Sequence, residues 1–149
     1  MTGSPDKIDY RALASFRHEI RSFLNFSENA ARATGIEPQQ HQALLAIKGA
    51  PAGFEVTVGY LAVRLHVRHH TAVELSRRLE ARRLIRRSRS WKDGRKVELS
   101  LTRRGDAVLR KISLVNRDEL RTAGVRLIRA LQSIIANAGA SGPAGRRGR

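Results

Sequence analysis

The segment WKDGRKVELSLT, residues 91–102, places three cations around an Asp-Gly pair, with Lys92 before it and Arg95 and Lys96 after it. A two-residue Asp-Gly connection between extended runs is a strong hairpin signal, because a type I′ turn requires positive φ at both central positions. After the turn, apolar and polar residues alternate over 97–102, which is the period of a half-buried strand. The pattern predicts a hairpin with one apolar face and a cationic tip, and such a tip favours an anionic partner.

A second polar group lies at the start of an expected helix, residues 69–83. Apolar residues at positions 72, 75 and 79 mark its buried side, so His70, Glu74 and Arg77 face away from the core. A short helix expected at 59–65 precedes it, and the segment LHVRHH at the junction has room only for a tight turn. This order indicates a helix-turn-helix, in which the first residues of the second helix reach base edges in the major groove.

Two alternatives apply to this group. A metal site at His69 and His70 is not favoured, because neighbours on a helix point about 100° apart and no thiol or suitably spaced carboxylate completes a set. Glu74 either accepts a hydrogen bond from cytosine N4 or pairs with Arg77 or Arg78, and its three- and four-residue spacing favours the ion pair.

The charge balance supports a polyanionic partner. The 149 residues include 29 Lys and Arg against 13 acidic residues, a net charge of +16. Residues 61–111 alone contain 16 cations and five acids, a net +11. The chain has no cysteine, which excludes disulfides and thiolate metal sites and is compatible with a reducing cytoplasm. No apolar run approaches the roughly 20 residues of a membrane-spanning helix, so a soluble intracellular protein is expected.

Periodicity predicts a mainly α fold with a small β hairpin. Amphipathic helices are expected over about 10–34, from Pro38 onward, and over about 118–136. The last follows a helix that Thr102 caps, with a break between the two, and Val56–Val58 is a candidate short strand. We expect a flexible N-terminus at 1–9 and a disordered basic tail at 139–149.

Residues 60–87, YLAVRLHVRHHTAVELSRRLEARRLIRR, followed by 93–105, DGRKVELSLTRRG, resemble the MarR family of bacterial transcription regulators. That family has a helix-turn-helix, an Asp-x-Arg wing and a Leu-x-Leu-Thr-x-x-Gly junction between strand and helix. The positions that match in register are Asp93, Arg95, Leu99, Leu101, Thr102 and Gly105. The sequence departs at Gly94, where the family often has a second Arg, so each wing loses one potential phosphate contact.

The resemblance implies one MarR-like domain over 10–138, with dimerisation helices at about 10–34 and 117–137 around a winged helix-turn-helix at about 38–105. It also implies a homodimer on a pseudo-palindromic promoter site, acting as a ligand-responsive repressor. In this family small aromatic effectors bind between the dimerisation helices and the winged domain. Phe16, Phe23 and His41 are therefore candidates for such a pocket, although dimer core is the favoured interpretation for the two Phe residues.

The candidate DNA contacts combine the helix start, the basic run and the hairpin. They are Arg68, His69, His70, Thr71, Glu74, Arg77, Arg78, Arg86, Arg87, Lys92, Arg95 and Lys96. Arg95 is placed for the minor groove, whose negative potential attracts arginine. Asp93 is expected to shape the turn and orient a nearby Arg.

The hypothesis from these patterns is a sequence-specific regulator of double-stranded DNA in the bacterial cytoplasm, associated with the nucleoid. The alternative is an architectural protein that binds nucleic acid by charge alone. No enzyme motif such as a P-loop or a His-Glu-x-x-His occurs, and no cofactor or metal is expected. A membrane-surface role is not favoured, because the amphipathic helices at the two ends are less basic than the central segment.

Overall fold

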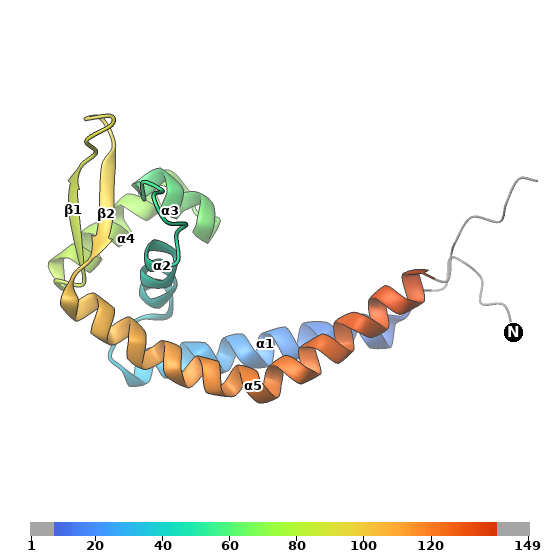
Figure 1. Ribbon diagram of the computed structural model, residues 1–149. Coiled ribbons are helices and arrows are strands. Elements are labelled where there is room, and N and C mark those ends of the chain that lie inside the picture. Colours follow the sequence, from blue (N-terminus) through green and yellow to red (C-terminus); the bar gives the residue numbers. More distant parts are fainter. Residues whose placement is uncertain (1–7, 140–149) are drawn as a thin grey trace, which may run out of the picture. The chain divides into compact units, whose positions relative to one another are not determined.

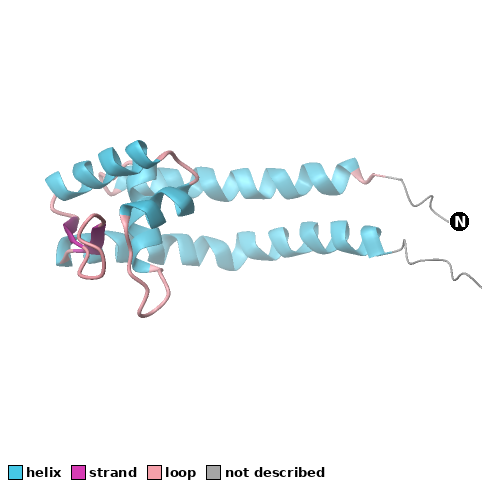
Figure 2. Ribbon diagram, turned by 90° about the horizontal axis from the view of Figure 1, so that it is seen from above, coloured by secondary structure: helices cyan, strands magenta, loops and turns pink. Residues whose placement is uncertain are grey.

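The computed structural model describes residues 8–139, and within them the chain forms five helices and one two-stranded antiparallel hairpin (Figure 1; Figure 2). The elements are α1 Tyr10–Ala33, α2 Pro38–Lys48, α3 Val58–Leu65, α4 His69–Ala81, β1 Ile85–Arg89, β2 Val97–Leu101 and α5 Arg103–Gly139. The described chain divides into two compact units: residues 27–116, called here the winged unit, and the helical segments 8–26 and 117–139, called the helical unit. The mainly α prediction with a small hairpin is confirmed.

The first helices begin and end with the capping groups that their sequences supply. Asp9 caps α1, because its Oδ1 accepts the Ala12 N–H at 3.0 Å. The flexible N-terminus expected at 1–9 stays a prediction, and residues 1–7 lie outside the described part, as do residues 140–149 of the expected basic tail. Just after the end of α1 comes Gly35, whose φ of +80° suits a residue without Cβ. α2 begins at Pro38, as predicted from the preference of proline for a first helical turn.

α3 and α4 form the helix-turn-helix of the winged unit. The Thr57 hydroxyl caps α3 by accepting the Tyr60 N–H at 3.1 Å. The chain then turns at His66, which adopts φ +53°, before α4 begins at His69. Ala72, Leu75 and Leu79 of α4 are buried, which confirms the buried side predicted from their spacing.

The hairpin differs from its prediction at the turn. β1 pairs with β2 from Ile85↔Leu101 to Arg89↔Val97, so residues 90–96 form a seven-residue loop. A β-turn runs from Asp93 to Lys96 within it, closed by the Lys96 N–H donating to Asp93 O at 2.9 Å. Gly94 is not among the glycines with positive φ, so the predicted two-residue type I′ turn is wrong. The physical reason is that Asp93 organises the loop by local side-chain bonds, which leave Gly94 at an ordinary φ.

Two further expectations are corrected. Val56–Val58 is not a strand: Thr57 makes one isolated bridge to Glu98, and Val56 O accepts the Leu99 N–H at 2.7 Å. The expected break before 118 is also absent, and α5 runs continuously from Arg103 to Gly139. No Gly or Pro occurs between Gly105 and Gly124, so nothing in the sequence interrupts that helix.

The core of the winged unit joins all its elements. Leu44 of α2, Leu61 of α3, Leu79 of α4, Ile85 of β1 and Ile112 of α5 each expose 2% or less of their surface. Their contacts hold α4 and the hairpin in one rigid arrangement, which places the candidate DNA contacts.

In the helical unit, α1 and α5 run antiparallel. Glu19 accepts a hydrogen bond from Arg126 at 3.0 Å, and Asp9 accepts one from Asn137 at 2.8 Å. From Glu19 to Asp9 the chain runs ten residues toward its N-terminus, while the partners Arg126 and Asn137 lie eleven residues apart toward the C-terminus, so the two segments are antiparallel. No helix within residues 8–139 is long and apolar enough to cross a membrane.

The junction between the hairpin and α5 requires glycine at 105. Thr102 caps α5 through its hydroxyl, which accepts the Gly105 N–H at 3.0 Å. A Cβ at Gly105 would overlap the carbonyl oxygen of Leu84, a backbone atom that also accepts the Thr102 N–H.

We predict that Gly105→Ala lowers the free energy of unfolding by about 2 kcal/mol or more, because backbone cannot yield as a flexible side chain can. Gly94→Ala is the matched control: its Cβ would meet nothing within 4 Å and its φ is not positive. Its effect should stay within about 0.5 kcal/mol. Urea denaturation measures both variants, and equal effects would contradict the close approach.

Candidate nucleic-acid interface

The outer side of α4 presents polar and basic side chains to solvent. His70, Glu74, Arg77 and Arg78 are exposed, and Thr71 is half-buried at the first turn. Arg68 precedes the helix as its N-cap residue and is exposed. This side of α4 therefore carries donors, acceptors and positive charge in the positions from which a recognition helix reads a groove.

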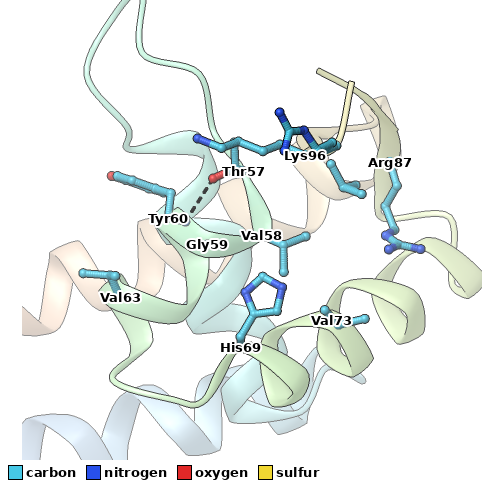
Figure 3. Close-up of a pocket in the computed structure, with 11 residues that line it drawn as sticks. Thr57, Val58, Gly59, Tyr60, Val63, His69, Val73, Arg87 and Lys96 are labelled. Atoms are coloured by element: carbon cyan, nitrogen blue, oxygen red, sulfur yellow. Dashed lines mark hydrogen bonds between the residues drawn. The ribbon is translucent and has the colours of Figure 1, made fainter. Parts of the chain in front are cut away.

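A pocket of about 430 Å³ lies where α4, the start of α3 and the hairpin meet (Figure 3). Its cationic lining comes from two parts of the hairpin: Arg87 from β1, and Arg95 and Lys96 from the loop. His69 of α4 lines it as well, while Val58 and Val73 form part of its apolar wall. The structure thus brings together four of the predicted site residues from different parts of the chain.

Arg87 is held by an acid rather than left free. Its side chain is only 18% exposed, and its Nη1 lies 4.0 Å from Glu80 Oε1. Glu80 Oε2 also accepts the Arg87 backbone N–H at 3.1 Å. The buried Nε of Arg87 has no partner among the described residues. Glu80 therefore orients this guanidinium beside the pocket, which leaves some of its donors available to a ligand.

The loop between the strands, residues 90–96, holds its charged residues by local bonds. Asp93 Oδ1 accepts the Arg95 N–H at 3.1 Å and lies 3.7 Å from Arg95 Nε. The Arg95 side chain is 95% exposed. Asp93 thus shapes the turn on which Arg95 stands, while the guanidinium remains in solvent. Lys92 and Lys96 are exposed on the same loop.

Glu74 lacks its expected ion pair, and Arg86 lies away from the pocket. Within the described chain Glu74 makes no ion pair with Arg77 or Arg78, so the favoured pairing is wrong; the cytosine contact stays a prediction. On α4 the two arginines extend into solvent, where water competes with a helix-surface pair worth only tenths of a kcal/mol. Arg86 is exposed on β1, on the strand side opposite to Arg87.

Arg82, at the end of α4, is a positioning residue that the sequence did not single out. Its Nη1 donates to Gln40 Oε1 and its Nη2 to Gly35 O, both at 2.8 Å. These bonds span 42 and 47 residues and tie the recognition helix to the connection between α1 and α2. No local pattern reveals such contacts, because Arg82 lies in a run of arginines that all look like surface cations.

The candidate effector residues occupy different surroundings. Phe16 and Phe23 are half-buried on α1, and His41 is buried on α2. Burial lowers the pKa of His41, because desolvation disfavours its charged form. Its Nε2 has no hydrogen-bond partner among the described residues. The effector pocket stays a prediction, and the pocket between α4 and the hairpin is not lined by these three residues.

We predict that Arg82→Ala lowers the free energy of unfolding by about 1–2 kcal/mol, since Gln40 and Gly35 lose charge-assisted bonds. Arg78→Ala, which removes an exposed arginine of the same helix, should change it by less than about 0.5 kcal/mol. Chemical denaturation followed by circular dichroism distinguishes them. Equal stability of both variants would show that Arg82 does not anchor the helix.

Comparison with known proteins identifies the fold. A family model described as the MarR family matches residues 34–96. No match was found among curated protein sequences. Similar solved structures include wild-type MarR from E. coli in its apo form, with 18% identity, a TM-score of 0.68 and coverage of 88% of this chain and 96% of that one.

Two other structures share the fold. A MepR mutant from S. aureus, bound to an oligodeoxyribonucleotide, is 20% identical with a TM-score of 0.62, covering 89% of this chain and 95% of that one. YusO from Bacillus subtilis is 21% identical with a TM-score of 0.62, covering 91% and 99%. The matched segment contains the helix-turn-helix and the loop with Asp93 and Arg95, and the fold extends over the described helices. Residues 34–96 of the chain therefore match the MarR family, and the described residues share the fold of these solved structures.

Proposed function

We propose that this regulator binds a pseudo-palindromic promoter site as a homodimer, represses transcription there, and releases the site when a small ligand binds. The observation that carries the DNA-binding part is the juxtaposition of the exposed side of α4 with the cation-lined pocket of the hairpin. The helix α4 has the dimensions and donors to enter a major groove, and the hairpin loop presents Arg95 beside that helix. The similar MepR structure is bound to an oligodeoxyribonucleotide, which supports DNA as the partner of this fold.

The charges in the interface favour specific placement over general attraction. Asp93 and Glu80 lie beside Arg95 and Arg87 and fix their surroundings. A protein that bound nucleic acid by charge alone would gain nothing from acids within its basic surface, since each weakens attraction to phosphate. The architectural alternative is therefore less well supported.

A second copy of the chain is the partner we propose for the helical unit. Its α5 segment exposes the large apolar residues Leu120, Val125, Ile128, Leu131 and Ile135. At 100° per residue they fall within an arc of about 140° on one side of the helix. Ala123 and Ala130 are buried on a neighbouring side. An apolar stripe of this extent on a single subunit is typical of a protein interface.

Repression follows from occupancy of the promoter, and the proposed ligand response follows from the spacing of the two winged units. Half-sites one helical turn apart require recognition helices about 34 Å apart. A ligand that binds better to a dimer with another spacing would lower the affinity for the site. Phe16, Phe23 and His41 remain our candidates for contacting a small aromatic effector.

We predict that the protein binds a labelled fragment from upstream of its own gene more tightly than an unrelated duplex of equal length. Fluorescence anisotropy across a salt series should show the upstream complex persisting at salt that dissociates the other. Arg95→Ala should weaken binding about tenfold and reduce the salt slope by about one, because one groove cation is lost.

Arg110→Ala removes the same charge from an exposed position of α5 within the winged unit and is the matched control. It should leave both affinity and slope close to those of the wild type. Binding curves that fall together for the two duplexes would contradict sequence-specific binding and favour the architectural alternative.

We further predict that Ile128→Asp converts a dimer into a monomer, because a carboxylate would be desolvated at the centre of the apolar stripe. Light scattering after size-exclusion chromatography reports the mass directly. Thr122→Asp introduces the same charge at an exposed position on another side of α5 and should remain dimeric. A wild-type protein that elutes as a monomer at micromolar concentration would refute the proposed dimer.

A further inference from the structure

Trp91 is a large apolar residue that packs against little of its own chain. It is the only tryptophan in the sequence, and 79% of its surface is exposed. It lies in the loop 90–96 that joins β1 to β2, which projects beyond the helices of the winged unit (Figure 1). Tryptophan is normally buried on most of its surface, so this exposure needs an explanation.

The backbone around Trp91 is fixed, so its exposure does not reflect a loop without structure. Ser90 is buried at 4% exposure, and its hydroxyl accepts the N–H groups of Lys92 at 3.1 Å and Asp93 at 3.0 Å. The Ser90 N–H donates to Lys96 O at 2.9 Å. Trp91 is therefore held between an anchored residue and a closed turn, with its indole outside the core.

The charges near the indole determine what kind of partner fits it. The Lys92 ammonium lies 5.1 Å from the centroid of the Trp91 ring, a cation–π geometry. Arg89, Arg95 and Lys96 are exposed on the same hairpin, and Asp93 is the one acid of the loop. An apolar protein surface would have to desolvate these cations, and a basic surface would repel them. A strand of nucleic acid offers apolar deoxyribose beside phosphate, which matches an indole beside an ammonium.

We propose that Trp91 is a DNA-contact residue of the wing, with its indole packed on a deoxyribose at the minor-groove edge and Lys92 directed to the adjacent phosphate. This inference rests on the proposed DNA-binding function and names a residue that adds affinity without adding charge. The contact buries an exposed aromatic surface, so its contribution is largely independent of salt.

The single tryptophan makes the contact directly measurable. Titration of the full-length protein with the upstream fragment is followed at once by anisotropy of the labelled DNA and by indole emission. We expect the emission change to saturate at the same DNA concentration as the anisotropy. We also expect bound DNA to protect the indole from acrylamide quenching several-fold.

Variants then test whether the contact contributes to affinity. Trp91→Ala should weaken binding about tenfold with an unchanged salt slope, and Trp91→Phe should restore most of the loss. Leu45→Ala is the matched control, because Leu45 is an exposed apolar residue of α2 in the same unit, at 50% exposure. It should bind as the wild type does. All three variants should keep the wild-type unfolding midpoint, since the replaced side chains are largely exposed.

The outcomes separate this inference from the function on which it rests. If anisotropy reports binding while indole emission and quenching stay unchanged, the Trp91 contact is refuted and the DNA-binding function stands. If no fragment binds, the proposed function itself fails. A loss of affinity that comes with a smaller salt slope would overturn the contact too, because it would mean that the substitution only displaced Lys92 or Arg95.

Discussion

The winged unit depends on one close approach, between the Leu84 carbonyl and Gly105. Four elements meet there: the end of α4, the start of β1, the end of β2 and the start of α5. Leu84 O accepts the Thr102 N–H at 3.1 Å, and Thr102 Oγ1 donates to Arg83 O at 2.7 Å. Arg83 itself adopts φ +58°, an uncommon conformation for a residue with a Cβ, which turns the chain from α4 into β1. The wing and the recognition helix keep a fixed relation because both are attached at this point.

The arginines of the protein fall into two groups that its sequence does not distinguish. Some arginines are structural: Arg82 anchors the end of α4, and Arg87 is paired with Glu80 beside the pocket. Others, such as Arg77, Arg78 and Arg95, extend into solvent. Guanidinium groups bonded in this way have part of their hydrogen-bonding capacity occupied, whereas the exposed ones keep most of theirs, even where an acid lies 3.7 Å away, as beside Arg95. The net charge alone therefore does not tell how many cations extend into solvent.

The sequence was sufficient for the elements that rest on local rules. Helical periodicity, Pro38 at a first turn and Thr102 as a cap all led to helices where the structure has them, because each works within a few residues. The predictions were wrong where a local sequence preference was outweighed by other interactions or had no helix-breaking residue to support it. The Asp-Gly pair indicated a tight turn, but Ser90 and Asp93 side chains organise a longer loop. The expected break in α5 had no helix-breaking residue behind it, since no Gly or Pro lies between Gly105 and Gly124.

The candidate site was predictable in part for the same reason. The exposed side of α4 followed from its buried side, whereas the pocket, the Glu80 pair of Arg87 and the anchor of Arg82 join residues that are distant in sequence or in different elements. Such contacts depend on the packing of the whole unit. The pairing expected for Glu74 failed because the exposed partners gain too little from meeting each other in water.

The attachment of the hairpin has a mechanical consequence. Its base is fixed on both strands, by the buried Ile85 and Leu99 and by the bond from Leu99 to Val56. Among the described residues, the hydrogen bonds that close the loop at the other end lie within the loop itself, through Ser90 and Asp93. The hairpin is therefore anchored to the rest of the winged unit at its base and not at its tip. The tip can therefore adapt to a surface that it contacts, while the root of the hairpin keeps its position relative to α4.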